Sequence, residues 1–150
     1  MRHTFLLETG DWEADGNYLS ADQSMIPVAG KVKIRHHSRY WTNEGSMKLL
    51  LEPTVEFFNH YQIQPFSFDS DLTTWVSENP DLGKMHGVFV IVGDCIMSKY
   101  ATVDGVYSGG EVLRQIDANT YENRGFALRG NEKLSSWVVR LTRVVNEKME

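Results

Sequence analysis

Hydrophobic and polar residues alternate along much of this 150-residue chain. From Trp12 to Tyr18 the even positions are apolar or small and the odd positions are polar, which is the two-residue period of a β-strand. Similar alternation runs through 31–41, and apolar extended runs recur at 85–92 and 95–102. Almost nothing shows the 3.6-residue period of a long helix. The pattern therefore predicts an all-β protein.

Turn-forming residues, mainly Gly, Asn and Asp, separate these segments at near-even spacing. The spacing predicts an up-and-down antiparallel β-barrel of roughly 8–10 strands. A β-sandwich is the main alternative. Consecutive hairpins without a long return connection favour the barrel, and closure also removes exposed sheet edges.

Several boundaries follow from this interpretation. Residues 20–30 are expected to form a long loop that acts as a lid or rim. Asn43-Glu44-Gly45 is expected to turn the chain into a strand through Phe57, with a bulge or an edge at Pro53. The whole of 1–150 is expected to be one barrel domain, with a cap at 1–9 and a polar tail at 146–150.

The two ends of the predicted barrel carry a matching pair of motifs. Gly10-Asp11-Trp12 opens the first strand, and the last strand carries Arg140 and Arg143. In this pairing the chain resembles the calycin superfamily, which includes lipocalins, fatty-acid-binding proteins and nitrobindin-like proteins. The resemblance implies that Trp12 packs beneath the barrel and that Arg143 or Arg140 lies across its ring as a structural clasp. It also implies a small molecule bound inside.

Net charge, cysteine content and the length of the apolar runs limit the partners and the location that the sequence allows. The net charge of −5 and the scattered basic residues argue against nucleic-acid binding. Cys95 is the only cysteine, so an intramolecular disulfide is excluded and a reducing, cytoplasmic location is expected. The longest apolar run, 88–92, is too short to span a membrane. The sequence leaves homodimerisation open.

Inward faces and strand direction together indicate which side chains line the open half of the barrel or its middle. Trp12 marks the closed end, and the candidate ligand-binding residues are Tyr18, Ile34, His36, Phe57, His86, Val88, Tyr100, Val112, Arg114 and Trp137. Arg114 is included only if its face is inward, where it would meet Glu111 or a ligand carboxylate. The alternative places Glu111, Leu113 and Gln115 inward and Arg114 in water.

The favoured function is binding of a small hydrophobic or amphipathic molecule within the barrel. The alternative is a small enzyme of the isomerase, cyclase or lyase type, in which His36 acts as acid or base beside Tyr40. His36 is equally well explained as a hydrogen-bonded core residue. No catalytic signature decides between them, and a filled barrel that serves as an interaction module is a third interpretation.

No metal or other cofactor is expected. The histidines show no dependable metal-ligand spacing, since His36 and His37 point to opposite faces of a strand. Nitrobindin-like barrels bind haem through a histidine late in the chain, whereas no histidine follows His86 here. The resemblance therefore disfavours haem.

Overall fold

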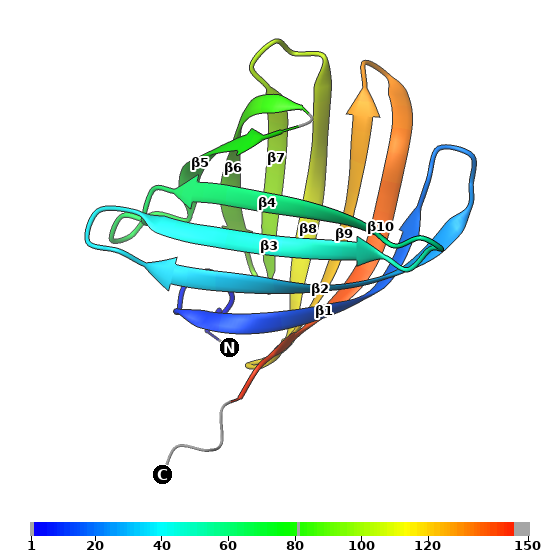
Figure 1. Ribbon diagram of the computed structural model, residues 1–150. Coiled ribbons are helices and arrows are strands. Elements are labelled where there is room, and N and C mark those ends of the chain that lie inside the picture. Colours follow the sequence, from blue (N-terminus) through cyan, green and yellow to red (C-terminus); the bar gives the residue numbers. More distant parts are fainter. Residues whose placement is uncertain (1, 81, 146–150) are drawn as a thin grey trace.

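The structure is a computed structural model that describes residues 2–80 and 82–145. Ten antiparallel strands in this part of the chain form a closed barrel (Figure 1). The strands are β1 (Gly10–Leu19), β2 (Met25–His36), β3 (Trp41–Leu49), β4 (Val55–Ile63), β5 (Leu72–Asn79), β6 (Gly83–Val92), β7 (Cys95–Thr102), β8 (Tyr107–Asp117), β9 (Thr120–Arg129) and β10 (Glu132–Arg143).

The connectivity is up-and-down, because each strand pairs with the next along the chain and β1 pairs with β10. The predicted fold class is confirmed. None of the described residues forms a helix long and apolar enough to cross a membrane. The predicted tail at 146–150 lies outside the described residues.

Three predicted boundaries were wrong. β2 already begins at Met25, so the loop before it is much shorter than 20–30. The turn after β2 lies at 37–40, where the His37 N–H donates to the Tyr40 carbonyl at 2.8 Å. The expected turn at 43–45 is instead the middle of β3, and a loop at 50–54 that contains Pro53 divides the expected long strand. Turn-forming residues therefore occur inside a strand here.

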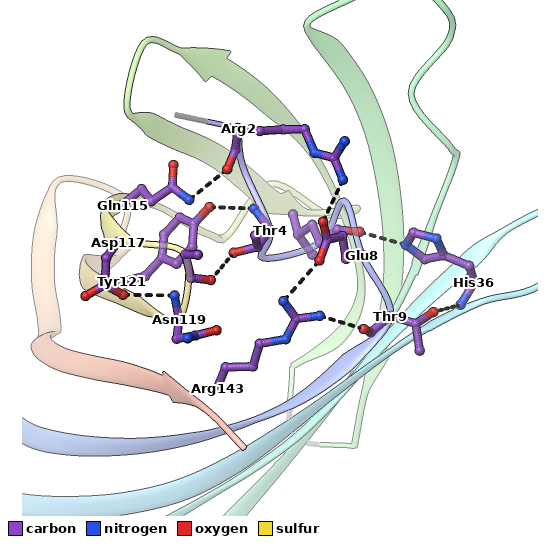
Figure 2. A network of polar contacts seen from close by, with 12 residues as sticks. Arg2, Thr4, Glu8, Thr9, His36, Gln115, Asp117, Asn119, Tyr121 and Arg143 are labelled. Carbon is purple, nitrogen blue, oxygen red and sulfur yellow. Dashed lines mark hydrogen bonds and ion pairs between the residues drawn. The ribbon is translucent and has the colours of Figure 1, made fainter. Parts of the chain in front are cut away.

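The N-terminal residues 2–9 cover one end of the barrel (Figure 2). Leu6 is completely buried, and the Phe5 ring packs edge-on against Trp12 with centroids 5.2 Å apart. The Thr4 N–H donates to the Tyr121 hydroxyl at 3.1 Å. His36 Nε2 donates to the Leu6 carbonyl at 2.8 Å. These contacts tie the segment to β1, β2 and β9 and make this the closed end.

The seam between β1 and β10 is held at the closed end by Trp12 and Arg143, which lie opposite each other in register. The Arg143 Cζ atom lies 5.8 Å from the centroid of the Trp12 ring. The same guanidinium donates to Glu8 Oε1 at 3.0 Å and to the Thr9 carbonyl at 3.1 Å. Of the two arginines considered, Arg143 makes this contact, whereas Arg140 is exposed and pairs with Glu122 at 3.6 Å.

The pairing between β4 and β5 is short. It joins only 61–63 to 75–77 among the described residues. The Ser77 hydroxyl adds one bond to the His60 carbonyl at 2.7 Å. The first half of β4, which carries the exposed side chain of Phe58, therefore has no ladder partner on its β5 side.

Replacing the clasp arginine should destabilise the barrel. Arg143→Leu removes the cation–π contact and both hydrogen bonds to the cap, so we expect a loss of about 1–3 kcal/mol in the free energy of unfolding. Arg140→Leu is the matched control. It removes one exposed ion pair, and we expect a change of about 0.5 kcal/mol or less. Urea unfolding measures both, and equal losses would contradict the assigned clasp.

Candidate ligand site in the barrel interior

The barrel interior differs between its two ends. At the closed end the inward side chains of Trp12, Ile34 and Tyr121 are almost completely buried. Farther towards the open end, some inward side chains, such as Val28, Leu49 and Met85, are also buried, but others keep part of their surface accessible. These partly accessible residues are Tyr18, Val32, Gly45, Met47, Asn59, Tyr61, Tyr100, Glu111 and Trp137. The interior is therefore filled at one end and accessible in its other half.

A short chain of hydrogen bonds crosses β8, β9 and β10 inside this accessible half. Trp137 Nε1 donates to Asn123 Oδ1 at 2.8 Å, and Asn123 Nδ2 donates to Glu111 Oε1 at 2.7 Å. An indole N–H can only donate, so it fixes which end of the Asn123 amide faces the carboxyl group. The chain therefore holds Glu111 in one orientation.

The second carboxyl oxygen of Glu111, Oε2, accepts no hydrogen bond from the described residues. Oε2 also does not belong to the fully buried side-chain atoms that lack a hydrogen-bond partner. Part of its surface is therefore accessible. Burial raises the pKa of the Glu111 carboxyl, and the hydrogen bond from Asn123 opposes that rise only in part. The interior thus presents one oriented, unpaired oxygen of a titratable group.

Aromatic rings line the interior near this carboxyl group. The Trp75 ring lies 4.5 Å from Tyr61 and 6.1 Å from Tyr100, measured between ring centroids. Trp75 Nε1 donates to the Ser98 hydroxyl at 3.3 Å. Burial raises the pKa of Tyr61, and it raises the pKa of Tyr100 to about 12, with the Glu111 charge contributing to both. Both phenols are therefore neutral hydrogen-bonding groups at ordinary pH.

Three large rings of the interior, those of Trp75, Tyr100 and Trp137, each rest on a glycine of a neighbouring strand. A Cβ atom at Gly125 would lie 2.3 Å from the Trp137 ring, and one at Gly87 would lie 2.5 Å from Trp75. A Cβ at Gly109 would lie 2.4 Å from the Tyr100 hydroxyl. Only glycine leaves room for these rings to lie against the wall of the barrel.

Several predicted ligand-binding residues face the interior. Tyr18, Tyr100 and Trp137 lie in its accessible half, and Phe57 faces inward near the open end, where 40% of its surface is exposed. Ile34 is inward but sits at the closed end opposite Gly10, so its predicted position in the open half or the middle of the barrel was wrong.

Four predicted residues do not reach the interior. These are His86, Val88, Val112 and Arg114, which lie on the outer face. Arg114 aligns with Glu122 on the outside, whereas its neighbours Leu113 and Gln115 are buried. The inward assignment of these residues was wrong because adjacent residues in a strand point to opposite faces. For β8 the alternative assignment, with Glu111 inward, is the correct one.

His36 and Tyr40 do not form a pair. The His36 ring stacks on Trp41, with centroids 3.9 Å apart, and bonds to the cap through Leu6. Tyr40 lies in the following turn and stacks on His37 at 4.7 Å. His36 is therefore part of the closed end, and the suggested acid–base pair is not assembled.

Sequence reasoning did not single out Tyr61, Trp75 or Asn123, and it considered Glu111 only as one of two alternatives. The signal available was the alternation Glu111, Leu113, Gln115, in which the apolar Leu113 shares a face with two polar residues. A buried carboxyl group is uncommon and indicates a functional site more often than a surface one does. The other three residues become neighbours only through the pairing of distant strands.

Comparisons with known proteins support the fold. No protein-family model and no curated protein matches the sequence. Among solved structures the chain is similar to an S-type phycobiliprotein lyase, CPES from Guillardia theta. Its TM-score is 0.55 and its sequence identity 6%, over 95% of this chain and 92% of the lyase. At this identity the similarity shows a shared fold and nothing further.

A second solved structure, a putative AttH from Nitrosomonas europaea, has a TM-score of 0.33 and 8% identity. The match covers 90% of this chain and 50% of that protein. This similarity is too weak to support an inference.

A methyl group at Gly125 should disturb the hydrogen-bonded chain. Gly125→Ala forces the Trp137 ring to move, so we expect a loss of about 1–3 kcal/mol in stability and a shift in tryptophan fluorescence. Gly45→Ala is the matched control, because a Cβ there meets nothing closer than 3.5 Å. Denaturant unfolding and emission spectra measure both. An unchanged Gly125→Ala protein would contradict the described packing.

Neutralising Glu111 should change how stability depends on pH. When the pKa of a carboxyl group is higher in the folded state than in the unfolded state, the free energy of unfolding of the protein falls as the pH rises. We therefore expect Glu111→Gln to equal or exceed the wild type in stability at neutral pH. The difference should shrink as pH falls towards about 4, near the ordinary pKa of glutamate. Urea unfolding over this pH range measures it, and a constant difference would argue against the burial effect.

Proposed function

We propose that this protein is a calycin-type barrel that binds a small amphipathic molecule in the accessible half of its interior. The observation that carries the proposal is the oriented Glu111 carboxyl group surrounded by partly accessible aromatic rings. Ligand sites are typically apolar and aromatic with a few well-placed polar groups. Tyr61, Tyr100 and Trp137 supply the first kind of surface, and Glu111 supplies the second.

The closed end supports this proposal because it blocks one exit of the barrel. Residues 2–9 seal that end, and the polar groups of the cap bond to one another and to the barrel. A ligand would enter from the open end, whose surroundings carry exposed apolar side chains such as Met25, Leu51 and Val103. The half of β4 that has no ladder partner in β5 lies next to the same entrance.

A lyase-type enzyme in the same barrel is the second candidate. The similar solved structure is named a phycobiliprotein lyase, which is consistent with either role. The observation that favours catalysis here is the buried position of Glu111 with one free oxygen, because burial raises the pKa of its carboxyl group and so favours its protonated form. Turnover of a screened substrate that Glu111→Gln abolishes, with substrate binding retained, would support this candidate.

Filling the interior should abolish binding. Gly45 faces inward, and a Cβ there would make only ordinary contacts, the nearest at 3.5 Å, so Gly45→Leu should occupy the accessible half without a backbone clash at its Cβ. We expect saturable binding of the neutral dye Nile red to the wild type and a loss of at least about tenfold in affinity for the variant. Fluorescence titration measures both.

Lys48→Leu is the control for this experiment, because Lys48 is exposed on the same strand. It adds an apolar side chain outside the barrel and should leave Nile red affinity unchanged. A wild type that shows no saturable binding, or an equal loss in both variants, would contradict binding within the interior.

A further inference from the structure

We propose that the barrel interior selects amphipathic molecules with a cationic or N–H donor group, which pairs with Oε2 of Glu111, over molecules with a carboxylate. This inference rests on the proposed binding function and names the class of ligand. It follows from the charge and the hydrogen-bonding groups inside the barrel.

The charge inside the accessible half is negative. Among the described inward positions between the two ends, no Lys, Arg or His accompanies Glu111. Arg143 and His36 lie at the closed end and are bonded to the cap. Arg129 is exposed at the open end, at the far end of β9. A ligand carboxylate would therefore meet a like charge, which costs free energy in an enclosed site.

The Oε2 atom of Glu111 is an acceptor that no donor of the described residues occupies. Asn123 occupies Oε1 of Glu111, and Oε2 has no donor from the described residues. A buried carboxylate without a second donor is poorly compensated, so a ligand donor at Oε2 would recover part of the desolvation cost. A protonated amine or another N–H group is the complement of this atom, and the nearby rings also attract cations.

The groups around Glu111 allow a clear pH dependence. The titratable groups facing it are Tyr61 of β4 and Tyr100 of β7, and both stay neutral at ordinary pH because their pKa values are raised. The neighbours from β9 and β10, Asn123 and Trp137, do not titrate. Lowering the pH therefore protonates Glu111 itself, and the preference for an amine should decline as it does.

The experiment compares three probes that share one alkyl chain: decylamine, decanol and decanoate. Each displaces Nile red from the full chain at neutral pH. We expect decylamine to bind at least about tenfold more tightly than decanol, and decanoate to bind more weakly than decanol. Glu111→Gln should remove the amine preference, because the amide keeps an acceptor for Asn123 but replaces Oε2 with a donor.

Glu56→Gln is the matched control, since it removes one negative charge from the exposed face of β4. It should keep the amine preference, which separates the site from the net charge of the protein. The wild type measured at falling pH provides a test that requires no substitution, and its amine preference should decline.

The outcomes are distinct. Equal affinity for the three probes, or an amine preference that survives in Glu111→Gln, overturns this inference and leaves the proposed binding function intact. Failure of decanol and Nile red to bind overturns both. Loss of the preference in Glu56→Gln assigns it to overall charge and also overturns the inference.

Discussion

Closure of the barrel depends on the pairing of β1 with β10. Without it, the first and last strands would each have an unpaired edge. Trp12 and Arg143 provide that contact across the seam. The arrangement has a cost, since the Trp12 indole N–H is buried without an acceptor among the described residues. The ring is nevertheless enclosed by Phe5 and Tyr121, and the guanidinium extends from it to Glu8 and Thr9. One contact therefore joins strand closure to the sealing of the barrel end.

Glutamate has opposite roles at the closed end and in the accessible half of the barrel. Glu8 accepts hydrogen bonds from Arg2 and Arg143, and these bonds lower the pKa of its carboxyl group. Glu111 has one neutral donor and no cation, so burial raises the pKa of its carboxyl group. The closed end thus pairs its charge within the protein, whereas the accessible half leaves a charge unpaired. An unpaired charge inside the barrel destabilises the fold on its own, and the proposed ligand would compensate for it.

The fold could be predicted from sequence because strand alternation and turn spacing are local properties. The clasp could be predicted because Gly10-Asp11-Trp12 and a terminal arginine stand at recognisable ends of the chain. Face assignment failed in β6 and β8, where both alternating sets contain apolar residues and a one-residue shift exchanges inside and outside. His86 and Val112 were placed inward on that basis, and the face of Arg114 was left open. The outward positions of all three follow from pairing with β5, β7 and β9. Register of this kind is set by distant strands, so the residues around Glu111 could not be assembled from local pattern alone.

The glycines of the barrel wall explain how large aromatic rings pack against it. Rings that stood across the barrel would fill it. Here Trp75, Tyr100 and Trp137 lie over Gly87, Gly109 and Gly125, in the space that a Cβ would otherwise occupy. Glycine inside a strand weakens a sheet because it has no side chain to pack, and here the rings fill that space. The glycines therefore belong to the proposed site as much as the rings that pack over them.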